Sequence, residues 1–397
     1  MFHSYFHPMY VYAISMILIG IQYIFKWKFP PEDEKDVKIG MNKTGSKIYR
    51  VISIVGIILM VYILYNSIFP PDHSDKAAKK WKMSGKENKV TAVSLNSNAD
   101  KFAVAVELKE RDNQIGIYDI KTGKFTDVKI LEDKRCLQAM DWGKGNVIAS
   151  TSENTVKLWD AETGEMIRSF RAHESGISSL CFTRDLSYLL TADADGICKI
   201  WNTESWELYK TIPDTPSAKQ PGKCTKLAVT SDNSIIALGF YDNIIQLWSF
   251  ETASLLNTII DTGADLTSIE FNNAGTILAS CSYDARLKLW SVESGNPIAN
   301  VESVDCPTCL DAFNTIKFTP DDKIIITSAK CDPLDEKGIM FWNAETHEKN
   351  PYMLIGHRAS DIYFDMPPDC SFIISAGSDG VKFWDLKDPE KPNPFVW

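Results

Sequence analysis

The sequence predicts an all-β fold, a seven-bladed β-propeller, preceded by an N-terminal α-helical hairpin that crosses a membrane twice. Three observations predict this arrangement. A short apolar strand that ends in an aromatic residue recurs seven times after Val90. Further short apolar runs, separated by turn residues, fill each repeat. Two long uncharged runs precede the repeats. We therefore expect two transmembrane helices within 1–70, a basic linker over 71–80 and the propeller over 81–397.

The aromatic residue that closes each repeated strand sets the period. Cys198-Lys199-Ile200-Trp201-Asn202 is a typical copy, and the first copy has a tyrosine in the tryptophan position. The seven aromatic residues are Tyr118, Trp159, Trp201, Trp248, Trp290, Trp342 and Trp384. They are 41, 42, 47, 42, 52 and 42 residues apart, which is the period of a four-stranded propeller blade.

Two repeats show all four expected strands. In the third repeat they are Ile177–Phe182, Tyr188–Asp193, Cys198–Trp201 and Leu208–Ile212. In the fifth they are Leu266–Phe271, Ile277–Ser282, Leu287–Trp290 and Ile298–Val301. Turn residues such as Asp195-Gly196 separate them, as in antiparallel hairpins.

These repeats resemble those of the WD40 repeat proteins, over about residues 80–397. In that family a His, a Ser or Thr, an Asp and a Trp form a hydrogen-bonded tetrad within a blade. The resemblance implies two such tetrads: His173, Thr191, Asp195 and Trp201 in the third repeat, and His357, Ser375, Asp379 and Trp384 in the seventh. The fourth and fifth repeats keep Asp242 and Asp284 but lack the His. The resemblance also implies assembly of protein complexes without catalysis.

Similar residue types form the triads of hydrolases. Here each set is followed by a Trp in a repeating frame, and no Gly-x-Ser-x-Gly motif accompanies either set. No glycine-rich phosphate-binding loop is present, and the 6 histidines are scattered. We therefore expect a structural network, no catalytic residues and no cofactor. A propeller enzyme is the alternative of another class, and no residue supports it.

The two uncharged runs, at 9–25 and 51–69, are long enough to cross a hydrocarbon core of ~30 Å. Each is followed by Phe-Pro-Pro, which stops a helix. A buried core helix or a signal peptide is the alternative, but no Lys or Arg precedes the first run. Basic residues on the two sides are nearly tied, so the orientation stays open. The lysines that follow the second run are candidate contacts for anionic lipid: Lys76, Lys79, Lys80 and Lys82.

A propeller needs a last outer strand to close its ring. Two segments compete for this place. Trp81-Lys82-Met83-Ser84 has the correct spacing before Val90, and Pro394-Phe395-Val396-Trp397 ends the chain. Proline lacks an N–H donor, so we favour the N-terminal segment.

All 9 cysteines lie in the repeats, at irregular spacings that are unlike a disulfide framework. Several fall in apolar runs, which favours free thiols and a reducing compartment. Cys306, Cys309 and Cys331 are a weak candidate for a metal or redox cluster, because two expected loops of the sixth blade bring them to one face. Free thiols or one disulfide are the alternatives. A structural zinc site needs a fourth ligand, and none is evident.

The charge is divided unequally along the chain. Residues 1–89 carry 13 Lys+Arg and 7 Asp+Glu, so the remaining 29 and 45 give residues 90–397 a net charge of −16. An acidic body argues against nucleic acid as a partner. The enlarged sixth repeat adds an acidic stretch with Asp332, Asp335 and Glu336, which is a candidate loop for a partner with a basic surface. A tolerated surface insertion is the alternative.

The function expected from the sequence is a membrane-tethered scaffold for protein–protein interactions. One version is an accessory subunit of a large membrane complex, such as one in the mitochondrial inner membrane. The other is a regulator of a small GTPase in vesicle budding at the endoplasmic reticulum. In both versions we expect the lipid bilayer and other protein subunits as partners, with the propeller on the reducing side.

Overall fold

A computed structural model describes most of the repeats. Its described residues are 74–75, 79–81, 89–107, 113–122, 125–131, 137–213, 223–261, 263, 265–284, 286–302, 314–331, 336–357 and 362–387. The chain divides into two compact units at Asp72 and His73, and only the second contains described residues. The expected transmembrane helices within 1–70 therefore lie outside the described residues. Across the described ranges, no helix is long and apolar enough to cross a membrane.

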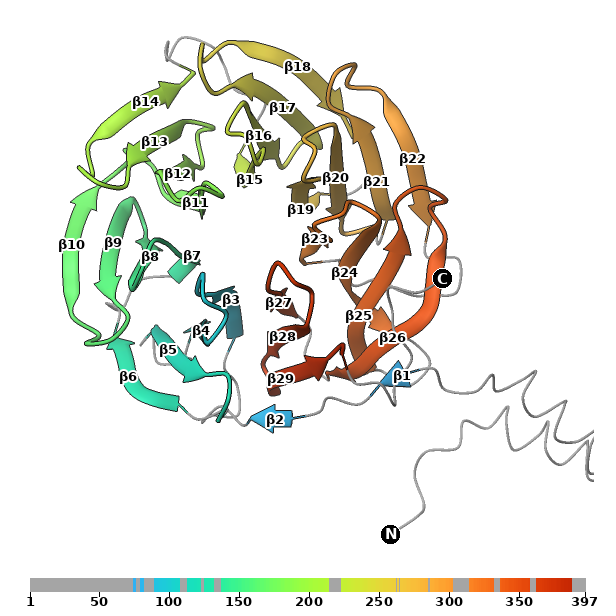
Figure 1. Ribbon diagram of the computed structural model, residues 1–397. Helices are drawn as coiled ribbons and strands as arrows, with labels where there is room; N and C mark the ends of the chain where they lie inside the picture. Colours follow the sequence, from blue (N-terminus) through green and yellow to red (C-terminus); the bar gives the residue numbers. More distant parts are fainter. Residues whose placement is uncertain are drawn as a thin grey trace, which may run out of the picture. The chain divides into compact units, whose positions relative to one another are not determined.

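Seven antiparallel sheets, the blades, surround one axis (Figure 1). Blade 1 contains β3 (Lys89–Leu95), β4 (Lys101–Glu107), β5 (Gln114–Asp119) and β6 (Phe125–Leu131). Blade 2 contains β7 (Leu137–Trp142), β8 (Val147–Ser152), β9 (Thr155–Asp160) and β10 (Met166–Arg171). Blade 3 contains β11 (Ile177–Phe182), β12 (Tyr188–Asp193), β13 (Cys198–Asn202) and β14 (Leu208–Ile212). Blade 4 contains β15 (Cys224–Val229), β16 (Ile235–Phe240), β17 (Ile244–Ser249) and β18 (Leu255–Ile260).

The remaining blades follow the same order. Blade 5 contains β19 (Leu266–Phe271), β20 (Ile277–Ser282), β21 (Arg286–Ser291) and β22 (Pro297–Glu302). Blade 6 contains β23 (Ile316–Phe318), β24 (Ile324–Cys331), β25 (Glu336–Asn343) and β26 (Lys349–His357), with β1 (Ser74–Asp75) as a fifth strand. Blade 7 contains β27 (Tyr363–Asp365), β28 (Phe372–Gly377), β29 (Gly380–Asp385) and β2 (Lys79–Trp81). The prediction of an all-β, seven-bladed propeller is confirmed for the described residues.

Burial changes from strand to strand within a blade. The second strands, such as β12 and β20, are buried in all but their first residue, because neighbouring blades cover both of their faces. They consequently read as continuous runs of apolar and small residues. The outer strand β10 is mostly exposed and carries two arginines. The expected strands of the third and fifth repeats agree with the structure to within one residue at each end.

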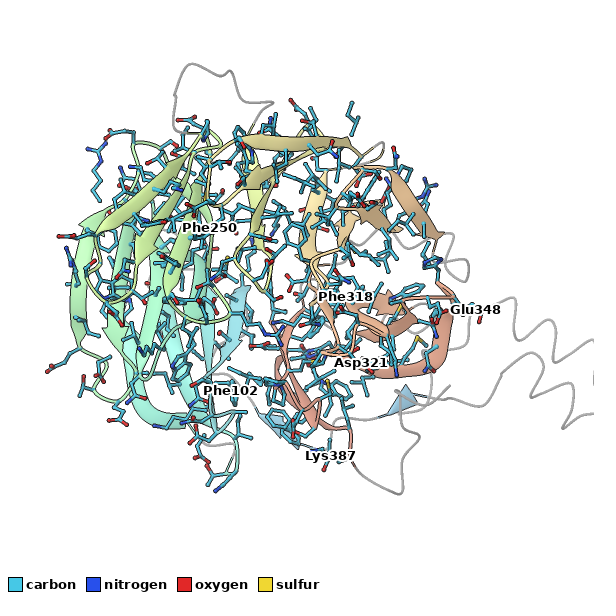
Figure 2. All side chains as sticks on the ribbon, turned by 45° about the horizontal axis from the view of Figure 1, so that its top comes forward. Phe102, Phe250, Phe318, Asp321, Glu348 and Lys387 are labelled. Atoms are coloured by element: carbon cyan, nitrogen blue, oxygen red, sulfur yellow. The ribbon has the colours of Figure 1, made fainter. Side chains whose placement is uncertain are left out.

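Apolar clusters between adjacent blades form the core. Leu190 of blade 3, for example, belongs to one cluster with Phe240 and Phe250 of blade 4. Phe102 of blade 1 belongs to a cluster with Ile374 of blade 7, so the first and last blades are packed together (Figure 2). This packing closes the ring through side chains.

The backbone also closes the ring. Strand β2 pairs antiparallel with β29, with Lys80 opposite Lys382 and Trp81 opposite Val381. An N-terminal strand thus completes blade 7, as expected, but it spans 79–81 instead of 81–84. The alternative segment at the C-terminal end lies outside the described residues. The range expected as a linker, 71–80, contains β1 and the first part of β2.

Candidate functional site

The tetrad of blade 7 is assembled from three strands and one turn. His357, at the end of β26, approaches Asp379 Oδ1 with its Nδ1 (2.7 Å) and Ser375 Oγ with its Nε2 (2.7 Å). Trp384 donates its indole N–H to Ser375 Oγ at 2.7 Å. Because the Asp379 carboxylate can only accept, His357 carries its proton on Nδ1, and the neutral ring then accepts the hydroxyl proton of Ser375 at Nε2. All four residues of this tetrad lie together as expected.

Charge strengthens this network at its outer end. Lys382 forms an ion pair with Asp379 at 2.5 Å. Burial acts to raise the pKa of Asp379, but the hydrogen bond from His357 and the hydrogen bond and charge of Lys382 outweigh it. The pKa of Asp379 is therefore well below its usual value.

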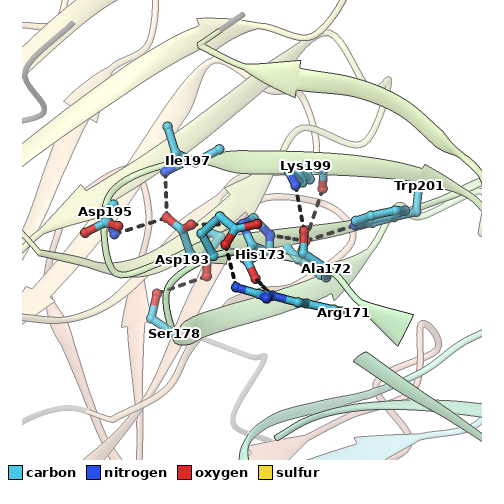
Figure 3. A network of polar contacts seen from close by, with 12 residues as sticks. Arg171, Ala172, His173, Ser178, Asp193, Asp195, Ile197, Lys199 and Trp201 are labelled. Atoms are coloured by element: carbon cyan, nitrogen blue, oxygen red, sulfur yellow. Dashed lines mark hydrogen bonds and ion pairs between the residues drawn. The ribbon is translucent and has the colours of Figure 1, made fainter. Parts of the chain in front are cut away.

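The tetrad of blade 3 differs from the prediction in its acid (Figure 3). His173 contacts Thr191 Oγ1 (2.7 Å) and Asp193 Oδ2 (3.0 Å), and Trp201 donates to Thr191 Oγ1 at 3.0 Å. The assignment of Asp195 to this network is therefore wrong. Asp193 ends strand β12 two residues after Thr191, so both side chains lie on the same face. Asp195 is exposed in the turn beyond.

The acid of the tetrad comes from different positions in blades 3 and 7, and the local sequence explains why. In blade 7 the residue two positions after the hydroxyl is Gly377, which has no side chain, so the acid comes from the turn as Asp379. In blade 3 the second carboxylate oxygen of Asp193 accepts the N–H groups of Asp195 and Ile197, which fixes the turn. Burial acts to raise the pKa of Asp193, but hydrogen bonds from His173 and Ile197 outweigh it and lower the pKa.

Blade 5 has an acid where the other two blades have a histidine. Asp261 accepts a hydrogen bond from Ser280 Oγ at 2.9 Å, and Trp290 donates to the same hydroxyl at 2.8 Å. Lys288 forms an ion pair with Asp261, and both side chains are almost fully buried. Blade 5 therefore has a Trp–Ser–Asp–Lys network that a search for His does not find.

Two further blades also have a hydrogen bond from the tryptophan to a buried hydroxyl among their described residues. Trp159 donates to Ser150 at 2.8 Å in blade 2, and Trp342 donates to Thr327 at 2.9 Å in blade 6. Trp248 of blade 4 meets no buried hydroxyl and donates to the Gln246 side chain at 3.2 Å.

The tetrads of blades 3 and 7 are not accessible to a substrate. The hydroxyls of Thr191 and Ser375 are fully buried, as is His357. A nucleophile needs contact with its substrate. The geometry therefore assigns the tetrads to structure: they join strands within a blade, in blade 7 also to β26 of blade 6, and satisfy buried polar groups.

A second set of residues, most of them polar, surrounds the propeller axis. It contains one residue at the same register position on the innermost strand of each blade, and we call it the inner ring: Ser94, Asp141, Cys181, Ala228, Glu270, Lys317 and Asp365. The innermost strands β3, β7, β11, β15, β19, β23 and β27 lie around the axis in Figure 1.

Two aspartates of the inner ring connect five blades. Asp141 of blade 2 accepts from Ser94 Oγ of blade 1 and from the backbone N–H of Phe182 in blade 3, both at 2.9 Å. Asp365 of blade 7 accepts from the backbone N–H of Leu95 in blade 1 at 2.8 Å and forms an ion pair with Lys317 of blade 6 at 2.7 Å. These carboxylates hold neighbouring blades together.

Burial shifts the ionisation of this ring. It raises the pKa of Glu270 to about 7, although Lys317 partly opposes the shift. Burial acts to lower the pKa of Lys317, but Asp365 and Glu270 outweigh it and raise the pKa. Burial also raises the pKa of the Cys181 thiol well above its usual value, so this thiol stays protonated and unreactive.

Exposed aromatic residues mark a different surface. Tyr241 and Asp242 lie in the turn between β16 and β17, and Tyr283 and Asp284 lie in the corresponding turn between β20 and β21. We call these four residues the turn patch. The two turns are linked: Asn243 donates to the carbonyl of Gly263 at 2.7 Å, and a side chain added at Gly263 would meet Asp284. Both tyrosines are about half exposed.

The turn patch has the composition of a protein-binding surface. Tyrosine supplies a large contact area at low entropic cost and is enriched at the centre of interfaces. The equivalent residue in blade 3 is Ala194, so a turn at this place can form without an aromatic ring. The sequence signal was the repeated Tyr-Asp pair. Sequence reasoning used only its aspartates, Asp242 and Asp284.

Most other predicted site residues lie outside the described part of the chain. Lys76, Lys82, Cys306, Cys309, Asp332 and Asp335 are among them. Lys79 and Lys80 lie in β2, Cys331 ends β24 and Glu336 begins β25, with Cys331 opposite Glu336 in the register. The extra length of blade 6 is partly in this hairpin, whose strands have 8 residues against 6 in β20 and β21. Within the described ranges, no group of His, Cys, Asp and Glu could hold a metal ion, and five cysteines are free thiols.

Comparison with known proteins supports this architecture. The family model "WD domain, G-beta repeat" (WD40) matches residues 164–202 and 254–291, which extend from β10 to β13 and from β18 to β21. The fold and tetrads define the chain as a seven-bladed β-propeller. The segments at 164–202 and 254–291 are thus similar to WD40 repeats, which agrees with the resemblance found in the sequence.

Three relatives are similar to this chain at low identity. Meiotic fizzy-related protein 1 of Schizosaccharomyces pombe is 20% identical over 69% of this chain and 73% of its own length. The human Denticleless protein homolog is 19% identical over 63% of this chain but 33% of its own length. Mouse Telomerase Cajal body protein 1 is 23% identical over 63% of this chain and 40% of its own length. The chain thus matches only about a third of the Denticleless protein and less than half of the mouse protein.

Proposed function

We propose that this chain is a non-catalytic scaffold whose turn patch binds a partner protein. The observation that carries the proposal is the pair of half-exposed tyrosines on linked turns of blades 4 and 5, at Tyr241 and Tyr283. Propellers expose their turns on a rigid frame, and binding residues are concentrated on such loops. The distant WD40 relatives support a role in binding, and the burial of both tetrads argues against catalysis.

The chemistry of the turn patch favours a partner with basic and apolar side chains. Asp242 is exposed beside Tyr241, Asp284 follows Tyr283, and Asp195 is exposed in the equivalent turn of blade 3. A Lys or Arg side chain could contact both an aromatic face and a carboxylate there. Because surface charges are screened by salt, this association should weaken as ionic strength rises.

The membrane attachment belongs to the same proposal. The uncharged runs at 9–25 and 51–69 support a pair of transmembrane helices, and Lys76, Lys79, Lys80 and Lys82 support contact with anionic lipid. A tethered scaffold suits an accessory subunit of a large membrane complex, for example in the mitochondrial inner membrane. Protease digestion of sealed vesicles, with a tag at each end of the chain, should protect both tags or neither. Protection of one tag alone would contradict a two-span topology.

Native purification of the tagged full chain, with quantitative mass spectrometry, tests the turn patch. The double variant Tyr241→Ala/Tyr283→Ala should lose specific subunits, because two aromatic anchors are removed without opening the core. Ile298→Ala is the matched control, since this exposed residue lies on the outer strand β22, away from the turns. Equal recovery of every subunit in both variants would refute the proposal. A small GTPase among the lost proteins would favour the endoplasmic-reticulum version.

A further inference from the structure

The outer strand of blade 4, β18, lacks the charges and prolines that often protect a sheet edge. Its sequence, Leu-Leu-Asn-Thr-Ile-Ile, contains no charged residue and no proline. All other outer strands that the structure describes contain at least one: Asp127 and Lys129 in β6, Arg168 and Arg171 in β10, Lys210 in β14, Pro297 and Glu302 in β22, Lys349 and Pro351 in β26, and Lys79 and Lys80 in β2. Charges and prolines on an edge strand prevent pairing with another chain. Strand β18 has no such barrier.

The exposed face of β18 is apolar. The strand pairs with β17 on one side and is the last strand of its sheet in the described structure. Leu256, Thr258 and Ile260 alternate onto one face and are all exposed, whereas Ile259 on the opposite face is buried in the core toward blade 5. Leu256 is 52% exposed, and Ile260, at 69%, is the most exposed large hydrophobic residue of the described chain.

Another outer edge of this propeller already accepts an additional strand. In blade 6, β1 runs parallel to β26, with Ser74 opposite Met353 and Asp75 opposite Leu354. The outer edge of a blade is therefore sterically open to a fifth strand. In blade 6 the chain itself supplies that strand.

We propose that β18 pairs antiparallel with β18 of a second copy of this chain. In an antiparallel pair of strands, opposing residues lie on the same face of the sheet. A two-fold symmetric pair must therefore have one residue opposite its own counterpart, with the axis between these two residues. With Thr258 at the centre, Leu256 opposes Ile260 of the other copy, and Thr258 opposes its own counterpart. Aliphatic pairs and Thr–Thr pairs are both favourable across antiparallel strands. This register pairs both Leu256 and Ile260 with an apolar side chain of the other copy.

The alternative register, centred on Asn257, is less complementary. It places Leu256 opposite Thr258 and leaves Ile260 opposite Ser254, which precedes the strand. The most exposed apolar side chain would then stay uncovered. The register centred on Thr258 is therefore the one that the side chains favour.

Electrostatics distinguish this contact from binding at the turn patch. The repeats carry a net charge of −16, so two copies repel each other, while the contact strand is uncharged. Salt screens the repulsion and should strengthen self-association. Binding of a basic partner should weaken under the same conditions. A single-strand contact is small, so the dimer should be weak and dependent on concentration.

Sedimentation velocity of the purified full chain in a non-ionic detergent tests the proposal. The wild type should show a monomer–dimer equilibrium in which the dimer fraction rises with protein and with salt. Leu256→Glu and Ile260→Lys should each weaken dimerisation by about tenfold or more, because each places an unpaired charge against an apolar residue. Met166→Glu and Ile298→Lys are the matched controls, since these residues of β10 and β22 are 53% and 45% exposed.

A charge-swap experiment tests the register itself. In an equal mixture of Leu256→Glu and Ile260→Lys, the introduced carboxylate opposes the introduced ammonium, so a heterodimer should form that salt now weakens. A wild type that remains monomeric at all attainable concentrations would overturn the proposal. A dimer that persists in Ile260→Lys would also overturn it, and would assign dimerisation to another part of the chain. The loss of subunits expected for Tyr241→Ala/Tyr283→Ala is measured separately, so neither result changes the test of the turn patch.

Discussion

At the scale of single residues, buried hydroxyl groups connect the strands of this propeller. Ser375 contacts both Trp384 and His357, and Thr191 contacts both Trp201 and His173. Each hydroxyl is fully buried. Removing one partner therefore leaves a polar atom that water cannot reach, and such atoms cost free energy.

Two tryptophan variants should separate the hydrogen bond from packing. Trp384→Phe removes the indole N–H that bonds to the buried Ser375, whereas Trp248→Phe removes a bond to the half-buried Gln246. We expect Trp384→Phe to cost about 1 kcal/mol more in unfolding free energy than Trp248→Phe. Trp384→Ala should cost ~3–5 kcal/mol because it also opens a cavity. Urea unfolding of residues 74–397 measures the differences, and equal costs for the two Phe variants would contradict this account.

The inner ring makes stability depend on pH through Glu270. Its pKa is raised from 4.5 to about 7 in the folded chain, so the unfolded chain loses this proton first. The contribution of the protonated Glu270 is fully present below pH 4.5 and is lost as pH rises toward about 7. Glu270→Gln should therefore stabilise the protein by roughly 1–3 kcal/mol at about pH 8 and have little effect at about pH 4.

Asp365→Asn is the matched variant in the same ring. It removes the ion pair with Lys317, and so it should destabilise the protein at about pH 8, opposite in sign to Glu270→Gln. Thermal unfolding across this pH range tests both variants. The same sign for both at high pH would show that burial of Glu270 is not the dominant effect.

Local patterns predict some residue roles and miss others. The tetrad of blade 7 follows the family spacing, so all four residues were found. The family pattern assigns Asp195 in blade 3, but it does not show that Asp193 shares a strand face with Thr191. In blade 5, Asp261 and Lys288 occupy the place that a histidine and its acid have in blades 3 and 7. The inner ring forms only because seven strands meet at one axis. Neither leaves a local signal.

At the scale of elements, the strands were predictable because apolar runs and turn residues alternate regularly. The pairing of β25 with β26 shows a constraint that this pattern does not reveal. A Cβ added at Gly338 would lie 2.0 Å from the carbonyl oxygen of Leu354. Only glycine permits this close approach of two backbones.

Gly338→Ala should consequently force β25 and β26 apart and cost about 3 kcal/mol or more. Gly239→Ala, in β16, is the comparison, because its added Cβ would meet the flexible ends of Leu266 and Ile269, at 3.3 and 3.4 Å, and Lys226 Cβ at an ordinary contact distance of 3.5 Å. It should cost about 1 kcal/mol or less. Denaturant midpoints of the two variants test the contrast, and a Gly338→Ala protein as stable as Gly239→Ala would exclude the clash.

At the scale of the whole molecule, the ring is closed by a strand that comes from the other end of the chain. Strand β2 covers the edge of β29, and without it that edge would be unpaired. Removing residues 1–88 should therefore lower the melting temperature more than removing residues 1–73, because only the longer deletion removes β1 and β2. Removing residues 388–397 should leave the melting temperature nearly unchanged. Calorimetry of the three truncated chains measures these melting temperatures. A larger decrease for the deletion of 388–397 than for the deletion of 1–88 would show that the C-terminal segment contributes more to closure of the ring.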